Sequence, residues 1–167
     1  MPIRQITDGL LLLGWECRGF VKMIHPEIIF RSIFNEKSMT IFSKIIAGQI
    51  PCYKIAENEK FFAFLDIEPL VAGHVLVVPK TEVDKLFDLP DDYLAGMLVF
   101  AKPIAHAIER AFACNRCGIS VVGLEVPHAH VHLLPINSAN DLNFTKGKMK
   151  TTPEELKAVQ EKILNNL

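Results

Sequence analysis

The order of apolar and polar residues along the chain predicts a protein with both strands and helices. Five short segments have the apolar alternation or the length typical of β-strands, at residues 52–56, 61–65, 74–79, 118–122 and 128–135. Four other segments are predicted to be helical, at residues 41–46, 80–86, 88–112 and 153–164. We therefore expect an α+β fold, in which an antiparallel sheet carries one main helix on a face.

Three local features refine this prediction. Residues 74–79 are almost continuously apolar, which favours a central strand covered on both faces. Pro103 lies inside the long helix, where it removes a backbone donor and is expected to produce a kink. Thr152, Pro153 and Glu155 have the types and the spacing of a helix start with a capping box.

Composition and charge exclude several classes of protein. The 167 residues are 50% hydrophobic and 22% charged, which is typical of one globular domain with a core. The net charge of -1 gives no reason to expect a nucleic acid or a membrane surface as partner. Four scattered cysteines indicate no disulfide framework and favour a cytoplasmic protein. No apolar run approaches the length of a membrane span.

The run from His128 to Pro135 holds three of the six histidines of the chain. Because side chains alternate along a strand, His128, His130 and His132 are expected on one face. The apolar residues between them are then expected to face the core, namely Ala129, Val131 and Leu133.

Three interpretations of this run compete. An exposed polar strand face is disfavoured, because histidine is not a preferred strand residue. A metal site is limited by distance: alternate residues lie about 6.6 Å apart along a strand, so the first and third histidines are about 13 Å apart. One zinc ion, with Zn–N bonds of about 2.0–2.1 Å, would need ligands from elsewhere. We favour a catalytic row, in which one neutral imidazole is the nucleophile and a neighbour binds the charged group under attack.

The run resembles the signature of the histidine triad (HIT) family, in which three histidines alternate with apolar residues. The resemblance implies a HIT-like fold, with about five antiparallel strands, one long helix and a C-terminal helix. It also implies hydrolysis or transfer of nucleoside monophosphates through a nucleotidyl-histidine intermediate on His130. By the same resemblance, His132 would bind phosphate oxygens and His128 would support the strand.

Residues 62–80 resemble a second block of this family. The resemblance implies that Asp66 binds the ribose hydroxyls, that Phe64 and Ile67 hold the base, and that His74 lies near the triad. An ionised aspartate suits the first role, because it offers acceptors to a vicinal diol. The residues alone leave open a strand-end cap for Asp66 and a buried structural histidine for His74.

The segment Gly123-Leu124-Glu125 matches the phosphate-contacting segment of the family. Gly123 would let the backbone approach an anion closely. Glu125 stands where the family has serine or threonine, and we expect it to donate a proton to the leaving group or to bind an amine there. Leu124 replaces a glutamine, and an asparagine-containing loop before Gly123 is missing, so polar contacts on that side are lost.

Some bacterial members bind structural zinc through a cysteine pair and two histidines. The matching positions here are Thr40, Ser43, Glu82 and His128, so we expect no zinc and no cofactor. Cys114 and Cys117 form a lone Cys-x-x-Cys pair, which is half of a zinc site.

Sequences of this family typically begin at a position that matches Met39. We therefore expect residues 1–38 to be an N-terminal extension outside the HIT domain, which would span 39–167, and Met39 to be the biological start. The alternative is a genuine extension that packs on the domain. The apolar patch at residues 10–13 is too short for a confident signal-peptide core.

These observations favour a nucleotide hydrolase or phosphoramidase that cleaves at the α-phosphate of a purine nucleotide, of the AMP or GMP type. The resemblance also implies a homodimer formed through the long helix and the adjacent strand. The competing hypothesis is a nucleotide-binding or partner-binding HIT protein with little turnover, and the missing loop and Leu124 are consistent with it.

Overall fold

The structure is a computed structural model, and it describes residues 39–167. The expectations for residues 1–38 lie outside the described residues. The strands are β1 (Lys54–Glu57), β2 (Phe61–Leu65), β3 (Val75–Pro79), β4 (Arg116–Ser120) and β5 (Val131–Ile136). The helices are α2 (Ile41–Ile46), α3 (Asp91–Ala111) and α4 (Pro153–Leu164), with short 3-10 turns η1 (Leu86–Asp88) and η2 (Ala139–Leu142).

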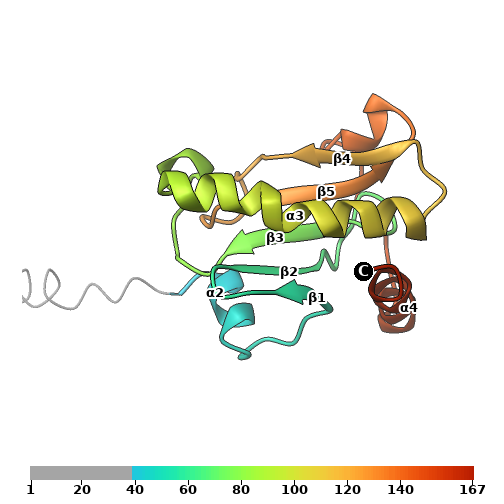
Figure 1. Cartoon of the computed structure of the whole chain (residues 1–167). Helices are drawn as coiled ribbons and strands as arrows, with labels where there is room; N and C mark the ends of the chain where they lie inside the picture. Colours follow the sequence, from blue (N-terminus) through green and yellow to red (C-terminus); the bar gives the residue numbers. More distant parts are fainter. Residues whose placement is uncertain (1–38) are drawn as a thin grey trace, which may run out of the picture. The chain divides into compact units, whose positions relative to one another are not determined.

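All five strands form one sheet, in the order β1-β2-β3-β5-β4, and every neighbouring pair is antiparallel. Strand β3 therefore lies at the centre, as its continuous apolar sequence predicts. Helix α3 crosses one face of the sheet and α4 lies beside it (Figure 1). The predicted α+β class, with one long helix and a C-terminal helix, is confirmed.

Two of the predicted helical segments differ from the structure. Residues 80–86 form no α-helix, and only the 3-10 turn η1 follows at Leu86–Asp88. Helix α3 begins at Asp91, after Pro90, rather than at residue 88, and it stays helical through Pro103. A proline leaves the carbonyl four residues before it without its helical partner. That residue is Val99, which is 72% exposed, so water can satisfy the carbonyl.

The two faces of the sheet carry different clusters of side chains. In β2, Phe61, Ala63 and Leu65 belong to the main core, which also includes buried residues of α3 and α4. Phe62 and Phe64 belong to a second cluster on the opposite face, against which α2 packs. This alternation is the direct result of the two-residue period of a strand, and it leaves the second face available for a site.

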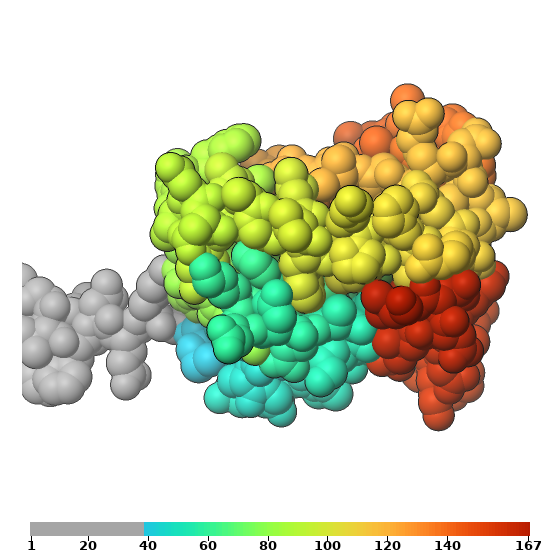
Figure 2. Space-filling model, viewed as in Figure 1, coloured from blue at the N-terminus to red at the C-terminus, as the bar shows by residue number. Residues whose placement is uncertain are grey.

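Helices α3 and α4 cover the main core. Six buried residues of α3 face the sheet, and Leu156 and Ile163 of α4 join them. Figure 2 shows both helices over this face of the molecule. Helix α4 starts with the predicted capping box, in which Thr152 and Glu155 exchange side-chain to backbone hydrogen bonds. None of the helices within residues 39–167 combines the length and the apolar character needed to cross a bilayer.

Candidate active site

The histidine run begins as an extended segment and enters β5 only at Val131. The alternation is as expected, because Ala129, Val131 and Leu133 lie in the main core. The prediction that the strand includes His128 and His130 is wrong: the pairing of β3 with β5 stops at the Val77–Val131 pair. Pro79 follows on β3 and has no N–H to donate, which is a reason for the ladder to end there.

His130 is buried, and its Nδ1 atom lies 2.6 Å from the carbonyl oxygen of His128. A carbonyl can only accept, so Nδ1 carries the ring proton of the neutral imidazole. The Nε2 atom of His130 then holds a lone pair, and the residue lines a cavity of about 230 Å³. A buried neutral imidazole with one nitrogen free of a proton is suited to nucleophilic attack.

His128 is completely buried behind His130 and is held at both ring nitrogens. Its Nε2 atom lies 2.8 Å from the carbonyl oxygen of Pro79, to which it must donate. Its Nδ1 atom is therefore an acceptor, and the Thr40 hydroxyl lies 2.8 Å away and donates to it. These two contacts hold His128, whose carbonyl in turn orients the ring of His130.

The four positions that match a zinc site in some relatives are joined here by hydrogen bonds. Ser43 donates its hydroxyl to Glu82, and the backbone N–H of Thr40 donates to the same carboxylate at 3.1 Å. Thr40 is also the N-cap of α2, accepting from the N–H of Ser43. Sequence reasoning missed the role of Thr40 beside His128. The sequence gives little indication of this contact, because threonine is a common N-cap wherever a helix begins.

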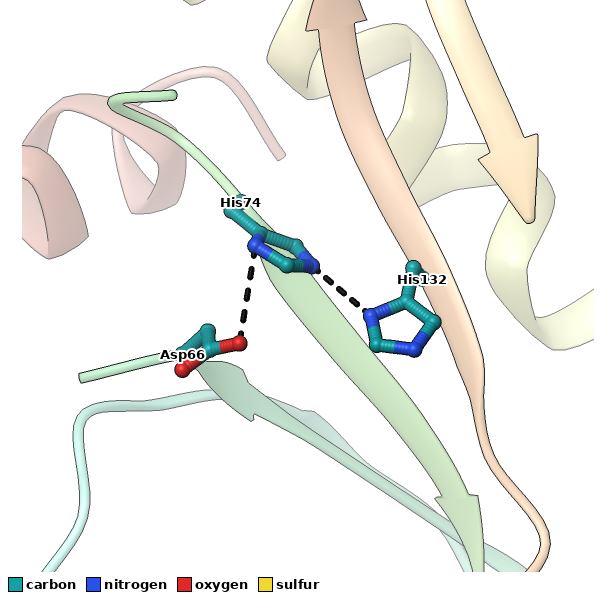
Figure 3. Close-up of side chains that lie close together, drawn as sticks. All are labelled: Asp66, His74 and His132. Carbon is teal, nitrogen blue, oxygen red and sulfur yellow. Dashed lines mark hydrogen bonds and ion pairs between the residues drawn. The ribbon is translucent and has the colours of Figure 1, made fainter. Parts of the chain in front are cut away.

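His132 and His74 form a second hydrogen-bonded pair (Figure 3), in which His74 Nε2 lies 2.9 Å from His132 Nδ1. The backbone N–H of Leu70 donates to His74 Nδ1 at 3.3 Å, so His74 Nε2 carries the proton and donates to His132. His132 then carries its own proton on Nε2. That atom is buried and has no hydrogen-bond partner among the described residues. His132 is also one of the residues that line the cavity.

Burial keeps both imidazoles neutral at neutral pH. It lowers the pKa of His74 to about 4 and, with a further contribution from His74 and His130, the pKa of His132 to about 3. Burial also raises the pKa of Asp66, whose carboxylate lies 3.5 Å from His74 Nδ1. Asp66 would form an ion pair with His74 only after the imidazole gained a proton, and burial opposes this step.

Within residues 39–167, Asp66, His74 and His132 form a group that could share a metal ion, with one ligand atom each within 4.8 Å of one another. His74, however, faces Asp66 with Nδ1 and His132 with Nε2. Because these are opposite nitrogens of one ring, the three residues form a chain rather than a cage. The Cys-x-x-Cys pair of Cys114 and Cys117 is the other candidate for a metal. Burial raises the pKa of Cys117 to about 12, which opposes formation of the thiolate that a metal needs.

The cavity beside His130 brings together six of the nine residues proposed from the sequence. They are Asp66, His74, Gly123, Glu125, His130 and His132. His128 lies behind this wall. Phe64 does not reach the cavity, because it is 4% exposed and packs in the second cluster under the ring of Phe42. Ile67 points elsewhere on the surface and is 64% exposed.

Gly123 and Glu125 come from the loop that precedes the histidines. Gly123 has φ +68°, a left-handed conformation that favours glycine, and a Cβ there would meet open space. The conformation of the loop, rather than crowding, therefore requires glycine. Glu125 is mostly exposed at the mouth of the cavity, where Lys148 donates to it at 3.0 Å.

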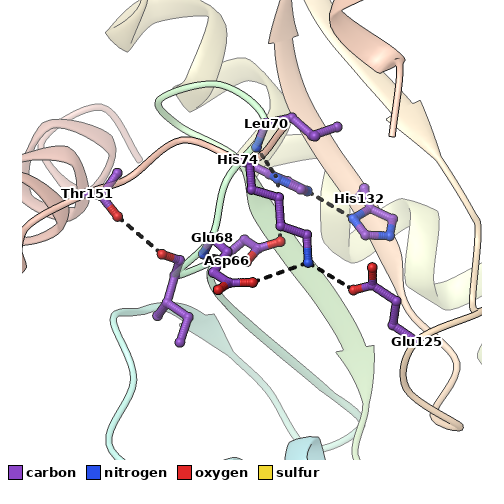
Figure 4. Close-up of polar contacts among 9 residues, drawn as sticks. Asp66, Glu68, Leu70, His74, Glu125, His132 and Thr151 are labelled. Atoms are coloured by element: carbon purple, nitrogen blue, oxygen red, sulfur yellow. Dashed lines mark hydrogen bonds and ion pairs between the residues drawn. The ribbon is translucent and has the colours of Figure 1, made fainter. Parts of the chain in front are cut away.

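Three further residues of the cavity come from the segment after η2, namely Phe144, Thr145 and Lys148. The ring of Phe144 lies 4.8 Å from that of His132, measured between centroids. Lys148 contacts Glu125 at 3.0 Å and also Glu68 at 3.3 Å. Figure 4 shows Glu68 and Glu125 together with Asp66, His74 and His132. The polar segment 143–151 holds one phenylalanine and three lysines without a periodic pattern, so sequence analysis had no means to place Phe144 and Lys148 here.

Comparison with known proteins agrees with this geometry. The family model described as "HIT domain" matches residues 47–139, more than half of the chain. The chain belongs to the HIT family. The adenosine 5'-monophosphoramidase of Schizosaccharomyces pombe is 36% identical to this HIT protein over 130 residues, which cover 76% of this chain and 97% of the relative.

Solved structures share the fold of this HIT protein. One is a Hit-like protein from Bartonella henselae, with a TM-score of 0.66 and 28% identity over 77% of this chain and 96% of the other. Another is a zinc-bound histidine triad family protein from Mycobacterium smegmatis, with a TM-score of 0.63 and 27% identity over 75% of this chain and 91% of the other. The expected HIT-like fold is thus confirmed.

Proposed function

We propose that this protein is a nucleotide hydrolase or phosphoramidase that forms a nucleotidyl-histidine intermediate on His130. The observation that carries the proposal is the 2.6 Å contact from His130 Nδ1 to the His128 carbonyl, which puts the lone pair of the neutral imidazole on Nε2 in a residue that lines the cavity. The similarity to an adenosine 5'-monophosphoramidase supports the same reaction class and an AMP-type substrate.

In the first step, the lone pair of His130 Nε2 attacks the α-phosphorus in line with the leaving group. A nitrogen–phosphorus bond forms, the bond to the leaving group breaks, and the leaving amine or oxygen takes up a proton. This proton comes from water. Glu125, at the mouth of the cavity and ion-paired with Lys148, is our candidate for the group that holds the departing amine. The second step replaces the nitrogen–phosphorus bond by a bond to water oxygen and regenerates the neutral imidazole.

The transition state carries negative charge on the phosphoryl oxygens. The Nε2–H of His132, which has no partner among the described residues, is the donor that we assign to these oxygens. Gly123 allows the backbone to come close to the same charge. Asp66 lines the same cavity, and we propose that its carboxylate binds the ribose hydroxyls. We assign the purine to the apolar surface near Phe64 and Ile67, outside this cavity.

No step of this scheme needs a metal ion, because the histidines supply both the nucleophile and the anion donor. We expect turnover to be unchanged after treatment with EDTA and gel filtration. A loss of activity that zinc restores would support the chain of Asp66, His74 and His132 as a metal site instead.

The decisive experiment captures the covalent intermediate. Wild-type protein is mixed with a nucleoside phosphoramidate, a dinucleoside polyphosphate or a nucleotide sugar, each labelled in the nucleotide, and quenched in alkaline denaturant. We expect a labelled protein from at least one substrate, with the label on His130. The His130→Ala variant should bind AMP but form no adduct.

His106→Ala is the matched control, since this imidazole is exposed on α3, away from the cavity. It should form the adduct at the wild-type rate. A wild-type protein that binds AMP but forms no adduct with any substrate would favour the competing function, a nucleotide-binding protein with little turnover.

We also propose that the protein is a homodimer, as the resemblance to the family implies. The supporting surface lies between α3 and the edge strand β4, where apolar residues line a groove of about 600 Å³. Phe87, Leu98, Ile119 and Val121 are all large apolar residues of this groove that are exposed in the single chain. An exposed apolar surface of this kind is typical of an interface. The cytoplasm as its location stays a prediction.

A further inference from the structure

We propose that Lys148 determines whether the cavity accepts an anionic nucleotide, by neutralising Glu68 and Glu125 at its mouth. The inference rests on the proposed function, because it assumes that a phosphate binds beside His130 and His132. It assigns a role in substrate binding to a residue of the C-terminal segment, outside the histidine run and outside the segments that resemble the family.

The charges that line the cavity motivate the proposal. Three carboxylates face it, from Asp66, Glu68 and Glu125, and a nucleotide phosphate would add further negative charge. Lys148 is the one lysine or arginine that lines this cavity within residues 39–167. Its ammonium lies 3.0 Å from Glu125 and 3.3 Å from Glu68, so it joins the two exposed carboxylates across the mouth.

The position of Lys148 is set by the backbone around it as well as by these ion pairs. The N–H of Met149 donates to the Pro69 carbonyl at 2.8 Å, and the Thr151 hydroxyl donates to the Ile67 carbonyl at 3.1 Å. The segment is thereby attached to the loop that carries Asp66 and Glu68. Phe144, at the other end, packs on His132.

A structural role alone would not explain this arrangement. Ion pairs between exposed groups contribute little to folding stability, because water screens them. Their effect on a bound anion is larger, because the anion would meet two carboxylates at close range if the ammonium were absent. Hydrogen bonding to Glu125 also raises the pKa of Lys148, so the ammonium stays charged at neutral pH.

The test compares two ligands that differ only in the phosphate, AMP and adenosine, by isothermal titration calorimetry on the full chain at low salt. Lys148→Met should weaken AMP binding at least tenfold and leave adenosine binding within twofold of wild type. Lys148→Arg should retain AMP binding. Lys146→Met is the matched control, because Lys146 is an exposed lysine of the same segment that does not line the cavity, and it should change neither affinity by more than twofold.

The double variant Lys148→Met/Glu125→Gln separates charge balance from direct contact. If Lys148 acts by neutralising carboxylates, removing one carboxylate should restore AMP affinity to within about threefold of wild type. A double variant that binds AMP no better than Lys148→Met would overturn the proposal, as would Lys148→Met binding AMP like Lys146→Met. Equal losses of AMP and adenosine affinity would also overturn it, because they indicate damage to the fold.

These outcomes are distinct from a failure of the proposed function. If wild-type protein binds AMP but forms no adduct on His130, the proposed reaction fails while the role of Lys148 in anion binding can still hold. If wild-type protein does not bind AMP at all, both proposals are wrong.

Discussion

The Nδ1 atom of His130 donates to the carbonyl oxygen of His128 at 2.6 Å, and this contact puts the lone pair of the neutral imidazole on Nε2. His128 is in turn held by Thr40 and by the carbonyl of Pro79. The orientation of the proposed nucleophile therefore depends on the N-cap residue of α2 and on the central strand β3.

Thr40→Val is expected to lower both stability and the rate of adduct formation. Valine keeps the shape of threonine but cannot donate to His128 or cap α2, so the free energy of unfolding should fall by about 1–3 kcal/mol. The adduct should form roughly tenfold more slowly, because the His128 carbonyl is less firmly held. Urea denaturation and single-turnover quench experiments measure the two effects.

Thr40→Ser is the control, because it keeps the hydroxyl and should retain most of the rate. If Thr40→Val formed the adduct as fast as wild type in folded protein, the hydroxyl would have no role in positioning the nucleophile.

Stability is expected to fall as the pH is lowered from about 6.5 toward 4. Burial lowers the pKa of His74 to about 4, below the usual value of 6.5. Between these values the unfolded chain binds a proton that the folded chain does not, so acid favours unfolding. His74→Gln keeps a donor for His132 but cannot titrate. The loss of unfolding free energy between pH 7 and pH 5 should therefore shrink by on the order of 1–2 kcal/mol.

Urea denaturation at the two pH values measures this difference. Burial raises the pKa of Asp66, so this group favours the folded state as the pH falls, opposite to His74. Asp66 is present in both wild type and His74→Gln, so comparison of these two proteins removes its contribution. His106→Gln, at an exposed position on α3, should keep the pH dependence of wild type. An identical pH dependence in His74→Gln and wild type would contradict the prediction.

Glu125→Gln should separate binding from turnover. The variant removes a carboxylate from the mouth of the cavity, so AMP should bind at least as tightly as it does to wild type. Turnover of a nucleoside phosphoramidate should fall by a factor of about 10 to 100, because the neutral glutamine lacks the negative charge that would hold the departing amine. Steady-state kinetics between pH 5 and pH 8 measure the effect, and unchanged turnover across that range would remove Glu125 from the mechanism.

Leu98→Glu should convert the proposed homodimer into a monomer. Leu98 is 55% exposed in the single chain and lines the groove between α3 and β4, so a charge there would be buried without a partner in a dimer. Size-exclusion chromatography with light scattering measures the mass. Leu164→Glu, on an exposed position of α4, is the control and should keep the mass of wild type. A wild-type protein that is monomeric at micromolar concentration would contradict the dimer.

Local pattern was sufficient for most of the fold. The alternation of the histidine run placed Ala129, Val131 and Leu133 toward the main core as predicted, because side-chain direction in an extended chain depends only on the two-residue period. The start of α4 followed from Thr152, Pro153 and Glu155 for a similar reason, since a capping box is made by residues three apart. The prediction of a helix at residues 80–86 is wrong, because a few apolar residues without a strong helix-start signal do not distinguish a helix from a turn.

The sequence by itself determined which imidazoles lie on one side of the chain and that they alternate with core residues. Only the tertiary structure decided their chemistry. Thr40 is 88 residues from His128, and His74 is 58 residues from His132, yet these hydrogen bonds decide where the ring protons reside. Lys148 likewise contacts Glu125 and Glu68, which are distant from it in the sequence. Contacts between distant residues depend on how strands and loops pack, and no local period encodes them.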